Sequence, residues 1–237
     1  MKSHLCTLFV ALLAMVGLLG TAPELWAIPL DEAKIIIEVN GTDGDGGIQI
    51  SVDGDEWIRL TVFDPSGLRI FDVSASNSLG VAGVTELFIE SEEPSFEDLP
   101  LDQLLARFPK GNYRIEAITV EGVRLTGQAT LKHNIPAGPL IVSPSEGATL
   151  HRNAVVIDWA PVTAPLPGSN LPVKIVGYQV TVEGEREVFS ANLPATITQV
   201  KVPAEVLQAN TEYDFEVLAI EQSGNQTITE SSFNTAP

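Results

Sequence analysis

The feature that most constrains this sequence is a series of short apolar runs, four to nine residues long, separated by glycine, proline, asparagine and aspartate. Such runs, rich in β-branched and aromatic residues, predict β-strands with turns between them. Only Leu101–Phe108 spaces its large apolar residues at i, i+3, i+4 and i+7, between two prolines, as a short amphipathic helix does. The chain is therefore predicted to be all-β with one short helix.

A proline- and glycine-containing segment, Asn134–Pro139, divides the chain. Two prolines and a glycine disfavour both helix and sheet pairing there, so we interpret the segment as a linker. It leaves two parts of about a hundred residues, the usual size of a β-sandwich. The sequence predicts a signal peptide over residues 1–27 and two tandem immunoglobulin-like β-sandwich domains, over residues 28–135 and 136–237.

The second half contains seven predicted strands at the spacing of a sandwich. They are Leu140–Ser143, Ala154–Trp159, Lys174–Val182, Glu187–Ala191, Thr196–Val202, Tyr213–Ile220 and Thr227–Phe233. Alternation is clear in the run that starts at Tyr213, where one face is apolar.

Several short motifs in this half occur in the order of a fibronectin type III domain. They are Val155–Pro161 with its tryptophan, Gly177–Val180, the run from Leu207 to Tyr213, the Gly224-Asn225 turn, and Phe233–Thr235. The second half resembles that family, which implies a core role for Trp159 and a tyrosine corner at Tyr213. It also implies a spacer or protein-interaction module. The long loop Pro161–Pro172 departs from the family pattern, and no Arg-Gly-Asp occurs, so integrin binding is not implied.

The first half is also predicted to be mostly strands, but its family is not assigned. Its predicted strands are Lys34–Asn40, Ile48–Asp53, Trp57–Phe63, Leu68–Val73, Val84–Ile89, Asn112–Val120 and Val123–Leu131. Asp64-Pro-Ser-Gly67 and Glu121-Gly122 are strong turn signals between neighbouring strands. We expect an immunoglobulin-like sandwich with a helical connection.

The N-terminus has the pattern of a secretory signal. Lys2 precedes the apolar run Leu5–Leu19, and small residues permit cleavage after Ala22 or after Ala27. A membrane anchor is the alternative, but the run is shorter than the roughly 20 residues that a spanning helix needs. Cys6 is the only cysteine and lies inside the signal, so the mature chain would have neither a disulfide nor a thiolate metal site. We expect a secreted or periplasmic protein with no membrane span after cleavage.

The charge and the missing motifs limit the function. With 31 acidic and 13 basic residues the net charge is −18, and such a surface repels nucleic acid. His133 and His151 have no neighbouring motif partner, and the sequence lacks the usual hydrolase, zinc-protease and phosphate-loop motifs. An enzyme is therefore not expected.

Two aspartate- and glycine-rich segments are candidate metal ligands. Asp43, Asp45, Asp53 and Asp55 could supply oxygens to calcium if the two segments meet in space, although the EF-hand spacing is not followed. The alternative is that aspartate and glycine simply form turns here. Asn40-Gly-Thr42 and Asn225-Gln-Thr227 also match glycosylation sequons.

A second acidic group consists of Glu90, Glu92, Glu93, Glu97 and Asp98. Paired carboxylates could perform acid/base chemistry on a glycoside if they faced each other across a cleft of about 5–10 Å. The alternative is a solvated acidic loop ahead of the helix.

One predicted sheet face combines aromatic and basic side chains. Simple alternation places Trp57, Arg59 and Phe63 on the same side of one strand, and it places Arg69 and Phe71 together on the next. These five residues could bind a glycan or a partner strand. They could equally form a second core face with arginines at its rim.

Together these features predict an exported, non-enzymatic binding or scaffolding protein whose β-sandwich domains bind another protein through loops or strand edges. The alternative is a carbohydrate-binding module, with or without dependence on calcium. The partner would accordingly be a protein or an extracellular polysaccharide. No cofactor other than calcium is expected.

Overall fold

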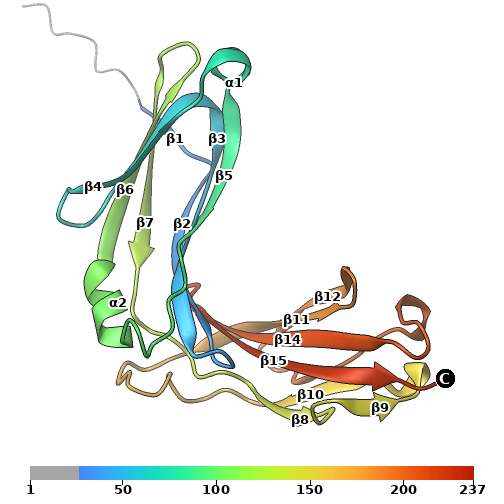
Figure 1. Ribbon diagram of the computed structural model, residues 1–237. Coiled ribbons are helices and arrows are strands. Elements are labelled where there is room, and N and C mark those ends of the chain that lie inside the picture. The colour runs from blue at the N-terminus through green and yellow to red at the C-terminus, as the bar shows by residue number, and fades with distance from the viewer. Residues whose placement is uncertain (1–26) are drawn as a thin grey trace, which may run out of the picture.

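A computed structural model describes residues 27–237 as two β-sandwich domains that meet in an L (Figure 1). The predicted fold class, two tandem immunoglobulin-like sandwiches, is confirmed. The predicted signal peptide and Cys6 lie outside the described residues, apart from Ala27. Among residues 27–237, no helix combines the length and the hydrophobicity required to cross a bilayer.

The first domain contains seven strands and two short helices. The strands are β1 (Ile28–Pro29), β2 (Glu32–Asn40), β3 (Asp45–Phe63), β4 (Arg69–Ser74), β5 (Val84–Glu90), β6 (Gly111–Thr119) and β7 (Arg124–Leu131), and the helices are α1 (Asn77–Ala82) and α2 (Leu101–Arg107). Helix α2 is the predicted helix, and its Leu104 is buried. Helix α1, which joins β4 to β5, has no buried residue and no amphipathic pattern that could have predicted it.

Strand β3 joins two of the predicted strands into one strand of 19 residues. Its first part pairs with β2 and β5, and its second part pairs with β6 and β4, with bulges on both sides of Trp57. A bulge bends a strand, which lets a single strand pass from one layer of a sandwich to the other. The core lies between the layers, and its largest fully buried side chains include Trp57, Tyr113 and Ile37.

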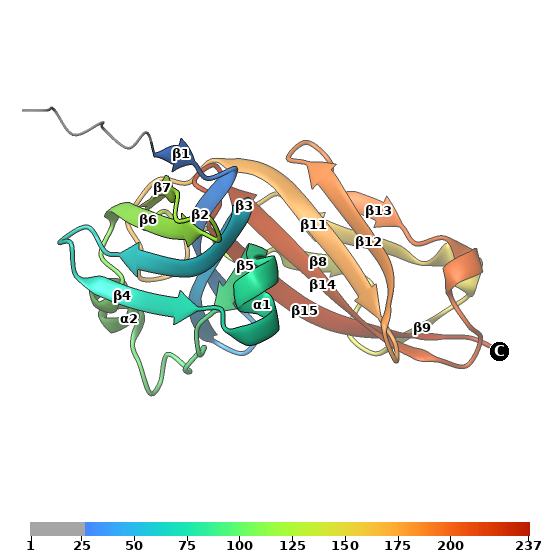
Figure 2. The ribbon, with the colours of Figure 1, turned by 90° about the horizontal axis from the view of Figure 1, so that it is seen from above.

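The second domain is a sandwich of a three-stranded and a four-stranded layer, and an eighth, short strand pairs along the edge of the four-stranded layer. Its strands are β8 (Leu140–Ser143), β9 (Ala148–Leu150), β10 (Val156–Ala160), β11 (Ile175–Glu183), β12 (Glu187–Pro194), β13 (Gln199–Lys201), β14 (Glu212–Glu221) and β15 (Gln226–Thr235), and it has two 3-10 turns, η1 (Arg152–Ala154) and η2 (Ala204–Val206). One layer has the order β13-β10-β8, and the other has the order β15-β14-β11-β12. Figure 2 shows these long strands running away from the first domain.

The core of the second domain has the features that the fibronectin resemblance implied. Trp159 is 1% exposed and meets Tyr178 edge-on at 5.3 Å between ring centroids. The Gln208 N–H donates to the Tyr213 hydroxyl at 2.8 Å, which forms a tyrosine corner beside buried Leu207. The fold of this domain is fibronectin type III-like.

The two domains share one hydrogen-bonded sheet. Residues Glu38–Asn40 at the end of β2 pair in parallel with Gln226–Ile228 at the start of β15, so a twelve-stranded sheet runs through both sandwiches. The Gly41 N–H extends this pairing by donating to the Ile228 carbonyl at 2.8 Å. The two domains are thus connected covalently by the linker and by hydrogen bonds through the pairing of β2 with β15.

Asn225 fixes this junction from inside. Its side chain is fully buried, accepts a hydrogen bond from the Ile37 N–H at 2.9 Å, and donates to the carbonyls of Lys132 and Asn134 at 2.8 and 3.0 Å. Buried Thr227 likewise donates to the Pro136 carbonyl at 2.7 Å. The second sequon-like motif therefore binds the linker to β2.

The substitution Asn225→Ala is expected to lower the free energy of unfolding by about 3 kcal/mol, because it leaves a buried amide and two carbonyls without partners. Urea denaturation of the full chain measures this loss. Gln222→Ala, an exposed position in the same turn, is the matched control and should stay within about 0.5 kcal/mol of the wild type. Equal midpoints for the two variants would contradict the assigned role of Asn225.

Candidate functional site

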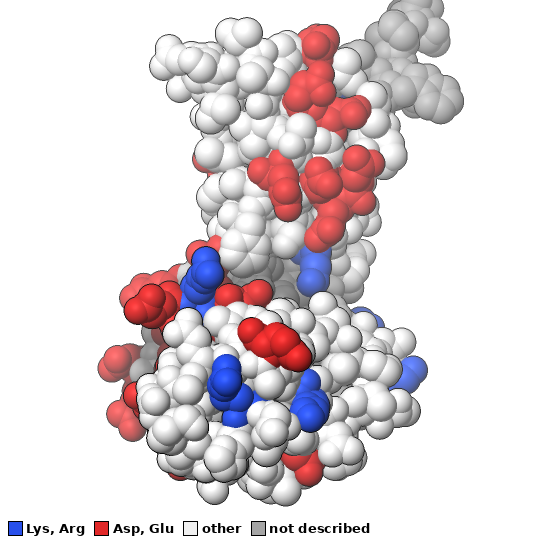
Figure 3. All heavy atoms as spheres, turned by 90° about the vertical axis from the view of Figure 1, so that its right-hand side faces the viewer, with Lys and Arg blue, Asp and Glu red and all other residues white. Residues whose placement is uncertain are grey.

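The inner side of the L is lined by the outer face of the β2–β3–β5 layer. Carboxylates gather on this face of the first domain, which is the upper lobe of Figure 3. The acidic side chains that the strand register places on it are Glu32, Glu38, Asp53, Glu86 and Glu90, together with one base, Lys34. We call this concave region the elbow.

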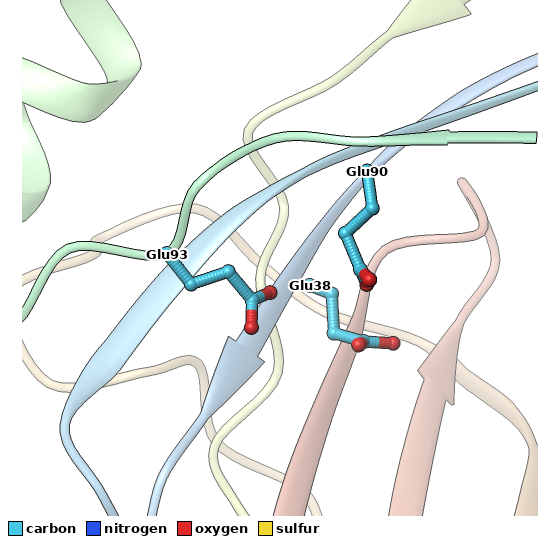
Figure 4. Close-up of side chains that lie close together, drawn as sticks. All are labelled: Glu38, Glu90 and Glu93. Atoms are coloured by element: carbon cyan, nitrogen blue, oxygen red, sulfur yellow. The ribbon is translucent and has the colours of Figure 1, made fainter.

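Three carboxylates meet at the base of the elbow (Figure 4). Oxygens of Glu38 from β2, Glu90 from β5 and Glu93 from the following loop lie within 4.8 Å of one another. Gln49 on β3 lies between the strands and donates to Glu38 and to Glu90, at 2.9 Å in each case. The amide of Gln226 donates to Glu38 from the second domain. The cluster is therefore built from both domains.

A glycine allows Glu93 to reach this position. Gly47 pairs with Glu38 in the β2–β3 ladder, and a Cβ there would lie 2.5 Å from the Ser91 hydroxyl and 3.0 Å from Cγ of Glu93. The Ser91 N–H donates to the Ile48 carbonyl at 3.0 Å, and the Ile48 N–H donates to the Ser91 hydroxyl at 2.9 Å. These bonds hold the loop against the bare backbone of Gly47.

The crowding changes the titration of the cluster. Burial, together with repulsion from Glu38, Glu90 and Asp45, raises the pKa of Glu93 to about 7. Burial also raises the pKa of Glu38, with a further contribution from Glu90, against the opposing hydrogen bonds from Gln226 and Gln49. Both carboxylates are thus easier to protonate than in solution.

The second domain continues the negative surface. Glu216 on β14 lies opposite Glu230 on β15, and burial followed by repulsion from Glu183, Glu230 and Glu38 raises the pKa of Glu216. A shallow hollow of about 350 Å³ next to it is lined by carboxylates, including Glu183, Glu216 and Glu230. The elbow therefore has acidic side chains on both of its walls.

This arrangement can attract a cation or a basic group, or it can hold protons. With one oxygen from each, the three carboxylates offer three ligands, whereas calcium takes six to eight. Their oxygens also lie within 4.8 Å of one another, closer than the roughly 5–10 Å across a cleft that the glycoside chemistry considered from the sequence needs. The geometry fits attraction of positive charge better than acid/base catalysis.

A more apolar hollow of about 500 Å³ lies on the linker side of the junction. It is lined by Val39, Asn40, Gly41, Gly44, Phe96, Leu101, Ala137, Gly138, Leu166, Pro167 and Thr229. Residues from both domains and from the linker contribute to it, so its shape depends on the same junction.

The four predicted metal ligands do not come together. Asp45 pairs with Asn40 at one end of the β2–β3 ladder, and Asp53 pairs with Glu32 at the other end. Asp45 and Asp53 are eight positions apart along β3, which is about 26 Å at 3.3 Å per residue. Asp43 lies near Asp45, and repulsion from Asp43 adds to the burial that raises the pKa of Asp45, whereas Asp55 lies beyond Asp53. The condition for a shared calcium site, that the two segments meet, is not fulfilled.

The predicted aromatic and basic face is divided by bulges. Trp57 pairs with Thr119 and Arg59 pairs with Ile118, so the extra residue at Ile58 reverses the alternation. Trp57 is consequently 2% exposed and belongs to the core. A second bulge, where Phe71 pairs with Val62 but Arg69 pairs with Phe63, places Phe71 against the core as well.

The remaining three residues of that face do come together. Arg59, Phe63 and Arg69 line a surface hollow of about 540 Å³ with Thr61, Glu116 and Ile118. The Asp72 carboxylate forms ion pairs with both arginines, at 2.6 Å from Arg59 and 2.9 Å from Arg69. The guanidinium of Arg114 lies 3.9 Å from the Phe63 ring centroid. The guanidinium groups of Arg59 and Arg69 and the ring of Phe63 thus already interact with other side chains of the first domain.

The residue that the sequence interpretation missed is Glu38. Glu90 and Glu93 were in the acidic group identified from the sequence, but their partner lies about fifty residues earlier, in Ile35-Ile-Ile-Glu38-Val39. A glutamate within a run of buried apolar residues costs free energy unless it has partners. That isolated charge was the available signal that β2 meets something polar on its outer face.

No protein-family model and no curated protein matches the chain. Solved structures that are similar include a spore cortex lytic enzyme of Clostridium perfringens, at 14% identity over 43% of this chain, with a TM-score of 0.29. The chain spans 28% of that enzyme chain. A two-domain fibronectin type III segment of chicken tenascin has 12% identity, covers 86% of this chain and 98% of its own, and has a TM-score of 0.29.

The three fibronectin domains FN1–FN3 of chicken CNTN1 give 13% identity, cover 89% of this chain and 68% of their own, and have a TM-score of 0.32. Identities and TM-scores of this size carry no argument about function.

The raised pKa of Glu93 predicts a pH-dependent stability. Between its ordinary value of 4.5 and about 7, the unfolded chain has released this proton and the folded chain retains it. The folded state then binds more protons, so the free energy of unfolding falls as pH rises through that window.

Glu93→Gln removes this titration. It should melt about 2–4 °C above the wild type at pH 7.5, the shift expected from about 1 kcal/mol after allowance for solvent screening, and should match the wild type near pH 4.5. Thermal melts at both pH values measure it. Glu97→Gln, in the same loop but outside the cluster, is the control. An identical pH slope for wild type and Glu93→Gln would refute the prediction.

Proposed function

We propose that this chain is an exported, non-enzymatic scaffold that binds another protein and presents both of its β-sandwich domains to that protein in a fixed relation. The observation that carries the proposal is the sheet that continues from β2 to β15, held by the buried side chain of Asn225. Export is supported by the signal-like sequence of Lys2 and Leu5–Leu19.

The physical basis of the proposal is preorganisation. Tandem domains joined by a linker usually move relative to one another unless their interface is substantial. Here strand pairing and buried hydrogen bonds connect the domains, so a partner that contacts both would not have to immobilise them. Rigid binding surfaces lose less entropy on association. This favours a protein whose task is to hold a partner in one geometry.

The elbow is the region that the proposal assigns to binding. It is concave, both domains contribute to it, and its carboxylates are only partly neutralised within the chain. A site whose charges are left unpaired is suited to a partner that pairs them, and the attraction would also accelerate encounter.

The test is a crosslinked capture from the envelope and medium of the producing cells, with tagged full-length protein as bait. We expect one protein to be enriched in a fixed ratio to the bait, and enrichment to fall when Glu38 and Glu216 are both replaced by lysine. The control bait replaces Glu97 and Glu205, acidic residues outside the elbow carboxylates, by lysine. Recovery of polysaccharide, or of no partner, would contradict the proposal.

A second candidate function is carbohydrate binding, which the hollow around Arg59, Phe63 and Arg69 favours. Trp57 cannot contribute because it is buried. If this candidate is correct, Phe63→Ala should abolish retention on an insoluble polysaccharide without loss of folding. Retention that is unchanged by Phe63→Ala would reject carbohydrate binding at this hollow.

Calcium dependence remains a prediction. It would appear as a higher melting temperature of the protein with calcium than with chelator, because saturation at a hundred times the Kd adds about 2.7 kcal/mol to the free energy of unfolding. A melting temperature that is the same with calcium and with chelator would reject calcium dependence.

A further inference from the structure

Strand β5 forms an open edge of the first domain. In the described part of the chain it pairs with β3 alone, and no backbone hydrogen bond to its other side occurs there. Figure 1 shows β5 at the margin of the first domain, on the side of the elbow. An edge seven residues long is a template for an added strand.

The hydrogen-bonding groups of this edge can be assigned from the ladder. The Ser91 N–H donates to the Ile48 carbonyl just beyond the strand. Because alternate residues of an antiparallel pair face the partner strand, the amides of Leu87 and Ile89 also face β3. The amides and carbonyls of Glu86, Phe88 and Glu90 therefore face away from β3, toward open space.

The side chains of the same three residues lie on the elbow face. Phe88 is 56% exposed, although Leu87 and Ile89 on the opposite face pack against the core. Glu86 and Glu90 are its neighbours on that face. The edge thus offers three outward backbone positions, one exposed aromatic ring and two carboxylates that flank it.

Charge determines which strand can be added. The carboxylates along β5 continue into the cluster at Glu38 and Glu93, where burial, together with repulsion between carboxylates, raises the pKa values of both groups. A second copy of this chain would bring the same charges to the same edge, and directly opposed like charges destabilise a strand pair. A strand with lysine or arginine at two positions four residues apart would pair Glu86 and Glu90 instead, because such positions lie on one face of a strand.

Other edges in residues 27–237 differ from β5. Strand β4 is six residues long with Ile70 38% exposed, but it begins with Arg69, which disfavours a basic partner. Strand β8 has exposed Leu140 and Val142 but is only four residues long. Strand β12 is eight residues long but carries no exposed large apolar side chain. The outer edge of β15 is already covered by β2 and β9.

We propose that the edge of β5 binds an extended, basic segment of a partner protein by strand addition, with apolar side chains of that segment against Phe88 and its basic side chains against Glu86 and Glu90. The inference rests on the proposed function, since it names where the partner binds and what chemistry it has. Backbone hydrogen bonds would supply affinity, and charge would supply specificity.

The probe is a synthetic nine-residue peptide with lysine at positions 3 and 7, valine at position 5 and threonine elsewhere, so that one face of the strand carries lysine, valine and lysine. Hydrogen exchange of the full chain, followed by NMR, should show at least tenfold slower exchange at Glu86, Phe88 and Glu90 when the peptide is saturating. The matched peptide with glutamate in place of lysine should give no protection. A peptide methylated at alternate backbone nitrogens should bind at least tenfold more weakly, which tests strand pairing without altering the protein.

Two variants at one position separate charge from backbone. Glu86→Gln removes the carboxylate and keeps the outward amide, whereas Glu86→Pro removes both and leaves the ladder to β3 intact, since proline is tolerated at the solvent side of an edge strand. Glu86→Pro should weaken binding at least tenfold more than Glu86→Gln does. Equal affinities of the two variants, or protection at β12 or β8 in place of β5, would overturn the proposal.

The cellular capture distinguishes this proposal from the function on which it rests. If Glu86→Pro bait enriches the same partner as Glu86→Gln bait to the same extent, strand addition at β5 is wrong and the scaffold function stands. If neither these baits nor the wild type enriches a protein, the scaffold function itself fails. Self-association of the chain that Glu86→Pro abolishes would show that the edge accepts a second copy, and would overturn the basic-partner assignment.

Discussion

The hydrogen bonds of the Asn225 side chain determine how the rest of the molecule is arranged. They join the turn before β15 to β2 and to the linker, so that the two sheets meet in register. Gly224, with a φ of 95°, lets this turn approach within contact of Ile36. The elbow, the carboxylate cluster and the apolar hollow beside the linker all lie where these two strands meet.

The junction brings together charges that oppose folding. Glu38 is 9% exposed, and its contacts with two glutamine amides only partly compensate its burial and the nearby Glu90. A fully apolar face at this position would give a more stable junction, as replacement of buried charges by packed apolar groups often does. Residues that lower the stability of the folded state are expected mainly at functional positions. For this reason the elbow, rather than the loops, is assigned to binding.

The local features of the fold were predictable from the sequence, whereas features that depend on distant pairing were not. Alternation predicted β14, and the spacing of leucines predicted α2, because each pattern lies within one element. The tyrosine corner at Tyr213 was implied by a motif of seven residues. The bulge at Ile58, however, depends on how β3 meets β6, and no residue pattern revealed that Trp57 would turn inward while Arg59 stayed outside.

The candidate site illustrates the same limit. Glu90 and Glu93 could be recognised as an acidic group, but nothing adjacent in sequence indicated that Glu38 completes it. The two sequon-like motifs, Asn40-Gly-Thr42 and Asn225-Gln-Thr227, each make a contact across the junction: Asn40 donates to Glu230, and Asn225 accepts from Ile37. Short polar side chains within apolar strands are costly unless they have partners. In a chain with two predicted sandwiches, such residues are therefore the positions at which to look for the contact between domains.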